Sequence, residues 1–381
     1  MGRAVLDLTP VGDALVGKAE IYARMTRGSD AMHVSGLDSH DCEVFKPFER
    51  FSIFPSEEFE RLPPQFGPDE DREVYHQGLL ERHLRHRAIS RPAEVLVIED
   101  AIVEFPSGAV MKNGKFVEEA TLSIRQLLKP SLFLPMTRGQ VTEVKGDAAM
   151  LPIQFWRSYG HWHTDVLPRW EALEATPLPP QVSLLFSDRL SEFHRATLNA
   201  ANIPPERQRL LKDGRYRVER LWLPTRTMEF SNVHPRNYRW IRDQLTKSLD
   251  SSPPKRRIYV SRGDAKVRRI LNEDDLFLAL KRLGFERIVN TDYDWRGQAQ
   301  NFRDAEVIVG PHGTNIANSV FCQPGAALLE IFGESVIDGT WSMASQVLGM
   351  KYGVVKDDLA GEHSVVEVPK VLRALQEIGV A

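Results

Sequence analysis

The chain has 381 residues, of which 42% are hydrophobic and 27% are charged, and its formal net charge at pH 7 is -3. This composition is typical of a soluble globular protein, and the length predicts two or three domains. Because the net charge is small and negative, it gives no electrostatic basis for binding nucleic acid. The two cysteines, Cys42 and Cys322, match neither a metal-site spacing nor a disulfide framework, which suits a reducing compartment.

The N-terminus has no positively charged segment followed by an apolar one, so we predict no signal peptide. No apolar run approaches the roughly 20 residues that a membrane-spanning helix needs. We therefore expect a cytoplasmic protein, and peripheral attachment to the inner face of a membrane stays open.

The first third of the chain is predicted to be rich in β-structure. Residues 1 to about 75 contain many turn formers, and short runs of strand composition follow at residues 94–98, 101–105, 108–111 and 115–117. Asn113-Gly114 separates the last two runs and favours a type I′ hairpin turn. The pattern predicts a β-meander that forms an accessory sheet or an elaborated sheet edge.

The middle of the chain alternates helical and strand patterns, which predicts an α/β unit. Residues 154–169 carry His161, His163 and Asp165 before a helical segment at 170–174. A strand at 182–186, an amphipathic helix at 190–201 and a strand at 219–223 follow. Ser-Ser-Pro-Pro at residues 251–254 is the clearest linker, and we place the main domain boundary there.

The segment from residue 256 to 332 predicts a second α/β unit with a parallel sheet. Its apolar runs lie at 257–260, 286–289, 306–309 and 327–332, and a helix is predicted at 273–283. Ser261-Arg262 follows the first run, and a polar loop at 310–315 follows the third. Ligands of open parallel sheets bind at the carboxyl ends of the strands, so we expect the site there. Residues 368–378 have the spacing of an amphipathic C-terminal helix.

The loop Pro311-His312-Gly313-Thr314-Asn315 joins a buried strand to a predicted helix. Glycine lets the backbone approach a ligand closely, and the N-terminus of a helix attracts an anion. His312, Thr314 and Asn315 can each donate a hydrogen bond to a phosphate. The alternative is that Thr314 caps the helix and Gly313 makes a turn without any ligand.

Arginines follow the first strand of this unit, at Arg262 and in the pair Arg268-Arg269. Their planar guanidinium groups suit a pyrophosphate, although a solvated basic surface is the alternative. Asn272 has the position of a helix N-cap. Glu330 lies inside an apolar strand, so its charge needs a partner, which could be ribose hydroxyls or an arginine.

Two groups of residues have the chemistry of a metal site, but the spacing of both is weak. Asp292 and Asp294 could share one hard cation, whereas an ordinary exposed loop is the simpler interpretation. His161, His163 and Asp165 could chelate a metal, yet no fourth ligand lies nearby. If the segment is helical, Asp165 shares a face with His161 and would orient its imidazole as a general base. The alternative is a buried histidine that its neighbour satisfies.

The motifs occur in a fixed order. They are Tyr159-Gly-His161-Trp162, Asp165, Leu167-Pro168-Arg169, Tyr259-Val-Ser-Arg262, Arg268-Arg269-Ile-Leu-Asn272-Glu273, Gly284-Phe285, Gln298, Phe302, Ala305, Val309-Gly310-Pro-His-Gly313, Asn318, Phe321 and Leu329-Glu330. This series resembles the signature of glycosyltransferase family 61, which includes capsular-polysaccharide biosynthesis proteins, and covers roughly residues 90 to 332. The sequence departs from the family pattern at Thr314, at Gly160 and at His163.

The resemblance implies a GT-B fold, in which two Rossmann-like halves face a cleft and the C-terminal half holds a nucleotide-sugar. It also implies inverting transfer of a sugar to a hydroxyl without an essential metal or other cofactor. Its donor-site candidates are Arg262, Arg269, His312, Gly313, Asn315 and Glu330, to which we add Ser261, Asn272 and Thr314. His161 and Asp165 are the catalytic candidates on the facing half.

We accordingly expect a β-rich N-terminal region (1–130), an acceptor-side α/β half (131–250), a nucleotide-sugar half (251–360) and a C-terminal helix (361–381) that crosses back to the first half. The hypothesis is a cytoplasmic, metal-independent glycosyltransferase. It would move a sugar from a UDP-linked donor to a polysaccharide or lipid-linked glycan in capsule or cell-surface polysaccharide biosynthesis. Two alternatives stay open: a non-catalytic nucleotide-sugar-binding scaffold, and a metal-dependent transferase or hydrolase built on His161, His163 and Asp165.

Overall fold

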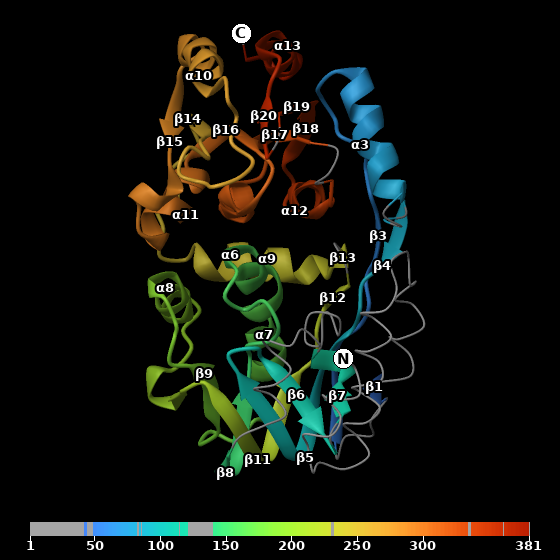
Figure 1. Ribbon diagram of the computed structural model, residues 1–381, viewed down its shortest axis with the longest axis vertical. Coiled ribbons are helices and arrows are strands. Elements are labelled where there is room, and N and C mark those ends of the chain that lie inside the picture. The colour runs from blue at the N-terminus through green and yellow to red at the C-terminus, as the bar shows by residue number, and fades with distance from the viewer. Residues whose placement is uncertain are drawn as a thin grey trace, which may run out of the picture.

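The computed structural model describes residues 42–43, 49–81, 84, 86–113, 115–120, 140–229, 232–333, 337–360 and 362–380. They form two α/β halves, one above the other in Figure 1, and helix α9 (Pro235–Leu245) lies across the level where the halves meet. The mixed α/β class with parallel strands that the sequence predicts is confirmed. Within these described ranges, every helix is too short or too polar to cross a bilayer.

The first half is built on a nine-stranded sheet with the order β1-β7-β6-β5-β11-β8-β9-β10, in which β2 also pairs with β5. Neighbours among β11, β8, β9 and β10 are parallel, whereas β5 pairs antiparallel with β11 and β6. Its strands are β1 (Cys42–Glu43), β2 (Glu49–Phe54), β5 (Ala93–Phe105), β6 (Ala109–Lys112), β7 (Lys115–Val117), β8 (Val141–Met150), β9 (Ser183–Ser187), β10 (Gln208–Leu211) and β11 (Gly214–Pro224). Its helices are η2 (Glu118–Ala120), α6 (Tyr159–His161), η3 (Trp162–Val166), α7 (Arg169–Glu174), α8 (Glu192–Ala200) and η4 (Pro205–Arg207), and the short pair β12 (Met228–Glu229) and β13 (Asn232–Val233) precedes α9.

The long strands of this sheet bend near their middle. Asp100 in β5 and Gly146 in β8 have φ angles of 50° and 74°, and the register between β8 and β11 shifts at the same level. Trp156, which follows the end of β8, donates through Nε1 to the carbonyl oxygen of Pro106 at 2.7 Å. Pro106 follows β5 at the opposite end of the paired strands, so the two arms of the bent sheet fold toward each other and enclose a core.

The second half contains a five-stranded parallel sheet with the order β15-β14-β16-β17-β18. The first strand in the chain has its two successors on opposite sides, so the sheet has a switch point between β14 and β16, where a ligand crevice is expected. Its strands are β14 (Arg256–Val260), β15 (Phe285–Ile288), β16 (Ala305–Pro311), β17 (Ala327–Phe332) and β18 (Lys351–Lys356), followed by the hairpin β19 (Asp358–Ala360) and β20 (His363–Val365). Its helices are α10 (Glu273–Arg282), η5 (Asn290–Asp292), α11 (Trp295–Arg303), η6 (Thr314–Phe321), α12 (Thr340–Val347) and α13 (Val368–Glu377).

Alternating side chains of this parallel sheet face two different cores. Tyr259 and Val309 pack with α10 and α13 on the outer face. Ile258, Ile308 and Leu328 belong to a second core that continues into the first half. The inner core is therefore shared by both halves, because the helices between the two sheets bury apolar residues against each.

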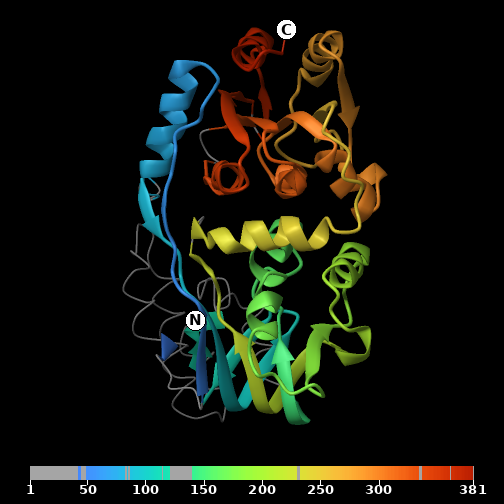
Figure 2. The same ribbon diagram turned by 180° about the vertical axis from the view of Figure 1, so that it is seen from behind.

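An N-terminal segment crosses from the first half to the second and back. After β2, the strand β3 (Glu58–Glu60) pairs with β4 (Arg87–Ile89), and between them Phe66 forms a parallel bridge with Gly353 of β18. Helix α3 (Asp69–Glu81) then lies beside the second half, as Figures 1 and 2 show. Asp71 of this helix accepts a hydrogen bond from Lys370 of α13 at 3.2 Å. We call the described residues between 58 and 89 the strap.

Two expectations about the domains need correction. Strands on both sides of residue 130 belong to the same nine-stranded sheet, so the β-rich region is an extension of the sheet of the first half and not a separate unit. Helix α13 does not cross back to the first half, because its buried Val371 and Leu375 find an apolar partner surface nearby, at Leu276 and Leu280 of α10. The strap makes the crossing instead.

Local elements agree more closely with the sequence. The runs predicted at 94–98 and 101–105 form one strand, β5, whose bend at Asp100 separates them. β6 and β7 pair antiparallel, as the hairpin motif predicts, although Gly114 itself lies outside the described residues. The helix predicted at 273–283 and the strand predicted at 327–332 are confirmed.

Candidate functional site

A pocket of about 270 Å³ lies between the two halves. The first half contributes Ser158, Gly160, His161, Thr164 and Met228, and the second half contributes Arg268, His312, Gly313, Thr314, Asp338, Thr340 and Trp341. The pocket therefore brings the predicted catalytic histidine together with the loop that follows β16. We call it the cleft pocket.

His161 lies at the end of α6, where the backbone widens into the π-helix η3, and Leu167 N bonds to Trp162 O at 2.9 Å. Such π turns occur often at functional sites. His161 Nδ1 and Asp165 Oδ2 are 2.5 Å apart, so Nδ1–H donates to the buried carboxylate. Within the part of the chain that the structure describes, His161 Nε2 has no partner and remains available to a ligand.

The pKa of His161 is set by two opposing effects. Burial lowers it, but the hydrogen bond and charge of Asp165 outweigh burial and raise the pKa above its ordinary value. The ring of Phe155, which has a φ of 64°, stacks on His161 with centroids 5.2 Å apart. His161 is therefore a basic, oriented imidazole at the wall of the cleft pocket, as the general-base hypothesis requires.

His163 does not join this pair. Its Nδ1–H donates to Tyr159 O at 2.8 Å, and its Nε2 accepts from Trp295 Nε1 of the second half at 3.2 Å. Both ring nitrogens are thus used, Nδ1 within the first half and Nε2 in a buried contact between the halves, and burial lowers the pKa of His163 to about 4. A metal bound by His161, His163 and Asp165 would need a free nitrogen lone pair on His163. Because both nitrogens of His163 already have hydrogen-bond partners, the geometry does not support this metal site.

The other two carboxylates considered for a metal are Asp294 and Asp292, and the first has a structural role. Asp294 accepts from Gly297 N at 2.7 Å and caps α11, whereas Asp292 lies exposed in η5. Among the residues that the structure describes, no group of three or more His, Cys, Asp or Glu side chains is arranged to hold a metal ion.

Gly313 makes the turn between β16 and η6 with a φ of 142°, a conformation that favours glycine. A Cβ atom at this position would lie 2.4 Å from Arg262 Nη1, because the arginine packs directly against the turn. Arg262 is 9% exposed and donates from Nη1 to Asn315 Oδ1 at 3.0 Å. Arg262 and Asn315 therefore support the turn. Of these four residues, only Gly313 and Thr314 line the cleft pocket.

His312 lies between two carboxylates. Its Nδ1–H donates to Glu330 Oε1, and its Nε2 is 3.5 Å from Asp338 Oδ2 at the cleft pocket. Burial alone would lower the pKa of His312, but the charges of Glu330 and Asp338 raise it above its ordinary value. His312 is accordingly a candidate cation facing the pocket.

Glu330 is 1% exposed and is not among the residues that line the cleft pocket. Its second oxygen accepts a hydrogen bond from the Tyr352 hydroxyl at 2.7 Å. Among the described residues, the partners of Glu330 are a histidine and a tyrosine, and not the arginine that was expected as the alternative. Its role in holding ribose stays a prediction, which this burial does not favour. The charge is balanced by His312 and Tyr352.

The structure reverses the roles of the two adjacent arginines. Arg268, which has a φ of 58°, lines the cleft pocket. Arg269 is exposed, and its backbone bonds to the β20 strand at His363 and Ser364. Arg268 is thus the cationic residue of the pocket, and no local pattern in the sequence distinguishes it from Arg269.

Two further donor-site candidates, Ser261 and Asn272, do not line the cleft pocket. The Ser261 hydroxyl donates to Glu273 Oε1 at 2.7 Å and accepts from Gly263 N at 3.0 Å. The Asn272 side chain exchanges two hydrogen bonds with the backbone of Val366, at 2.8 and 3.0 Å, and does not cap its own helix. Both residues fix loops around the site.

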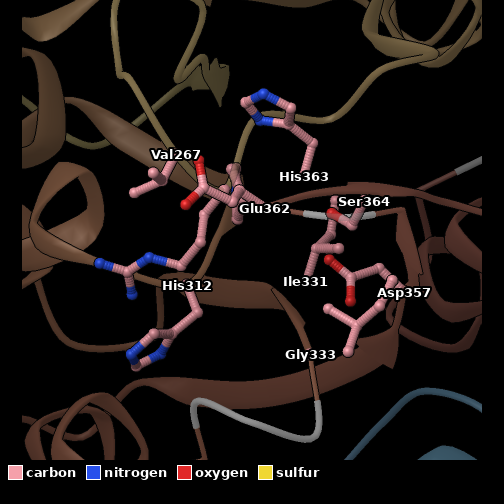
Figure 3. Close-up of a pocket in the computed structure, with 11 residues that line it drawn as sticks. Val267, His312, Ile331, Gly333, Asp357, Glu362, His363 and Ser364 are labelled. Atoms are coloured by element: carbon pink, nitrogen blue, oxygen red, sulfur yellow. The ribbon is translucent and has the colours of Figure 1, made fainter.

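A second pocket, of about 260 Å³, adjoins the first and shares Arg268 and His312 with it. It opens at the carboxyl ends of β16, β17 and β18, beneath the β19–β20 hairpin. Figure 3 shows His312 and Asp357 on opposite sides of this pocket, with Ile331 between them, and the His363 ring pointing away from its centre. Its lining is Val267, Arg268, Pro311, His312, Ile331, Gly333, Asp357, Leu359, Glu362, His363 and Ser364. We call it the hairpin pocket.

The lining includes four charged residues that were not among the expected catalytic and donor-site residues: Arg268, which was considered only as part of an arginine pair, and Asp338, Asp357 and Glu362. Asp338 follows β17, so the rule that ligands bind beyond strand ends could have indicated it. Glu362 lies in a hairpin whose position over the sheet has no signal in the chain around it.

Comparison with protein-family models matches residues 159–329 to Glycosyltransferase 61. A search of curated proteins finds no match. The matched segment runs from the start of α6, next to His161, through the loop at His312, and therefore includes residues from both walls of the cleft pocket. Residues 159–329 are a glycosyltransferase family 61 domain, and the protein is a glycosyltransferase.

Proposed function

We propose that the enzyme transfers a sugar from a nucleotide-sugar, expected to be UDP-linked, to a hydroxyl of a glycan acceptor, with inversion at the anomeric carbon. The observation that carries this proposal is the cleft pocket, where His161 on one half faces Arg268, His312 and the Gly313 turn on the other. A base on one wall and cationic donors on the opposite wall are what a single displacement requires.

The donor diphosphate fits the wall formed by the second half. Arg268 and a protonated His312 would neutralise its charge. The first N–H groups of η6 have no partner within the helix and point to its N-terminal side, where anions bind. This cationic wall is also the basis for proposing that transfer proceeds without a metal or other cofactor.

The nucleoside fits the hairpin pocket, which is continuous with the diphosphate wall through Arg268 and His312. Its apolar residues, including Val267 and Ile331, suit a base. Glu362 replaces Glu330 as the carboxylate proposed to accept hydrogen bonds from the ribose hydroxyls.

The acceptor would approach from the first half. Its hydroxyl oxygen forms a bond to the anomeric carbon, and its proton passes to His161 Nε2, which Asp165 orients and makes basic. The bond from the anomeric carbon to the diphosphate oxygen breaks, and its electron pair leaves with the diphosphate. One such displacement inverts the anomeric configuration.

The two halves on either side of the cleft pocket support a GT-B-like arrangement, in which the second half is the donor half. We further propose a cytoplasmic enzyme, in peripheral contact with the inner membrane face, that extends a polysaccharide or lipid-linked glycan for a capsule or cell surface. The family resemblance supports this biological setting.

Calorimetric titration with UDP, GDP and CMP, with and without EDTA, tests the donor side. Micromolar binding of UDP that survives EDTA is expected, and binding of no nucleotide would refute the donor proposal. A product formed from an α-linked donor should carry a β-linkage by NMR, whereas an α-linkage would refute inversion.

A further inference from the structure

A chain of polar side chains runs from the cleft pocket through the second half to the strap. His312 Nδ1–H donates to Glu330 Oε1, and Tyr352 of β18 donates to Glu330 Oε2 at 2.7 Å. The Tyr75 side chain of α3 lies beside Tyr352, with ring centroids 5.9 Å apart, and its hydroxyl interacts with the hydroxyls of Tyr352 and Ser342. Because the single hydroxyl proton of Tyr352 goes to Glu330, Tyr75 can act on Tyr352 only as a donor.

Every member of this chain is buried. Glu330 and Tyr75 are 1% exposed and Tyr352 is 4% exposed, so water does not compensate for a missing partner. A buried carboxylate is stabilised as an anion only by the donors that reach it, and within the described residues these are His312 and Tyr352. The strength of the Tyr352 hydrogen bond therefore controls how strongly Glu330 attracts the proton on His312.

The strap holds Tyr75 in this position through contacts made by the residues that precede it. Phe66 bridges Gly353, the residue after Tyr352, and Gln65 N donates to Tyr352 O at 2.7 Å. Farther along, Asp71 accepts from Lys356 N at 2.9 Å. The Tyr75 ring packs edge-on against Phe332 with centroids 5.1 Å apart. α3 is thus fixed to the strands that carry Glu330 and Tyr352.

We infer that Tyr352 and Tyr75 are positioning residues that set the protonation of His312 through Glu330, so that the N-terminal strap tunes the cleft pocket. The inference rests on the proposed function only in its consequence for turnover. The other charged groups that face His312 are Asp338, from the loop before α12, and Arg268, from the loop after β14. Neither contacts Tyr352 or Tyr75, so changes to the tyrosines leave these charges in place.

The test is Tyr352→Phe and Tyr75→Phe, each of which removes only a hydroxyl group from a buried ring. Without the Tyr352 donor, the Glu330–His312 pair binds a proton about tenfold more tightly, because a hydrogen bond to its anionic form is lost. The pair should then titrate about one pH unit higher. Tyr75→Phe should move it in the same direction by less, since it weakens the Tyr352 hydroxyl as a donor.

Tyr259→Phe is the matched control. Tyr259 is buried in the same sheet and donates to the Glu273 carboxylate at 2.9 Å, but Glu273 has no contact with His312. The readout is NMR titration of 13C-labelled histidine, with the His312 signal assigned by His312→Gln. It needs neither donor nor acceptor, so it distinguishes failure of this inference from failure of the proposed function.

The inference is supported if the pH at which His312 titrates is higher in both Tyr352→Phe and Tyr75→Phe than in the wild type, and is unchanged in Tyr259→Phe. If the His312 signal titrates at the same pH in Tyr352→Phe as in the wild type, the inference is overturned. A change in Tyr352→Phe without one in Tyr75→Phe would overturn the connection to the strap. If Tyr352→Phe does not fold, Tyr75→Phe alone decides, because an unchanged titration there also contradicts the proposed chain.

Discussion

The turn at Gly313 offers the sharpest quantitative test of the site. In Gly313→Ala the new Cβ atom would lie 2.4 Å from Arg262 Nη1 and 3.3 Å from Asn315 Oδ1. The backbone angles, φ 142° and ψ -167°, belong to a region that is essentially restricted to glycine and costs about 1–3 kcal/mol for other residues. The arginine must also move, which breaks its hydrogen bond to Asn315.

That hydrogen bond involves a charged, buried donor and contributes about 1.5–3 kcal/mol. Together with the backbone strain, the expected loss of unfolding free energy is about 3–5 kcal/mol. This is a large part of the roughly 5–15 kcal/mol that folded proteins have. Displacement of Arg262 toward the pocket should also weaken nucleotide binding at least about tenfold, because errors of about 1 Å at a positioned site are costly.

Gly325→Ala is the control, because Gly325 also has a positive φ, 88°, but no atom lies within 4 Å of its added Cβ. It should lose only about 1–2 kcal/mol and bind nucleotide normally. Urea unfolding and calorimetric titration with UDP measure the two effects. If both variants lose the same stability and both bind UDP as the wild type does, Arg262 does not hold the Gly313 turn and the reasoning is refuted.

The other predictions concern charge and protonation. His161→Ala should lower kcat by a factor of about 10²–10⁴ and leave the UDP affinity unchanged. Wild-type turnover should rise with pH through the raised pKa of His161, because the base acts when it is deprotonated. Full turnover by the folded His161→Ala variant would refute the assignment of His161 as the base. Arg268→Ala should weaken UDP binding at least about tenfold and Arg269→Ala should not, and the reverse result in calorimetry would contradict the geometry of the cleft pocket. Burial lowers the pKa of both His163 and His194 to about 4. Below about pH 6.5 the unfolded chain therefore binds more protons than the folded chain, and the free energy of unfolding should fall toward pH 4 by up to about 3 kcal/mol per histidine. Denaturant midpoints that do not change over this range would contradict the prediction.

Local patterns were sufficient to predict the elements and the general place of the site. Runs of apolar residues gave strand positions within a few residues, and the rule that ligands bind beyond strand ends located the loop at His312. The same rule could not tell which side chains face a ligand. Arg262 and Glu330 have the chemistry of ligand-binding residues, yet the structure uses the arginine to brace a turn and the glutamate to hold a histidine.

The remaining differences come from contacts between residues far apart in the chain. The sequence of residues 58–89 does not indicate that Phe66 will pair with Gly353. Such pairing depends on which edge strand of the folded second half is left without a neighbour. The same holds for α13, whose apolar face could have matched either half. It packs on α10, which leaves the crossing to the strap.

The position of the strap connects these differences to function. In the first half it continues from strands that extend the large sheet, and in the second half it places Tyr75 beside Tyr352, which is linked through Glu330 to His312. The His163–Trp295 hydrogen bond joins the halves close to His161, the proposed base. Catalytic groups on opposite walls must be held to within a fraction of an ångström to act together. We therefore expect that the strap and this buried contact, together with the shared core, keep the two walls of the cleft pocket in register.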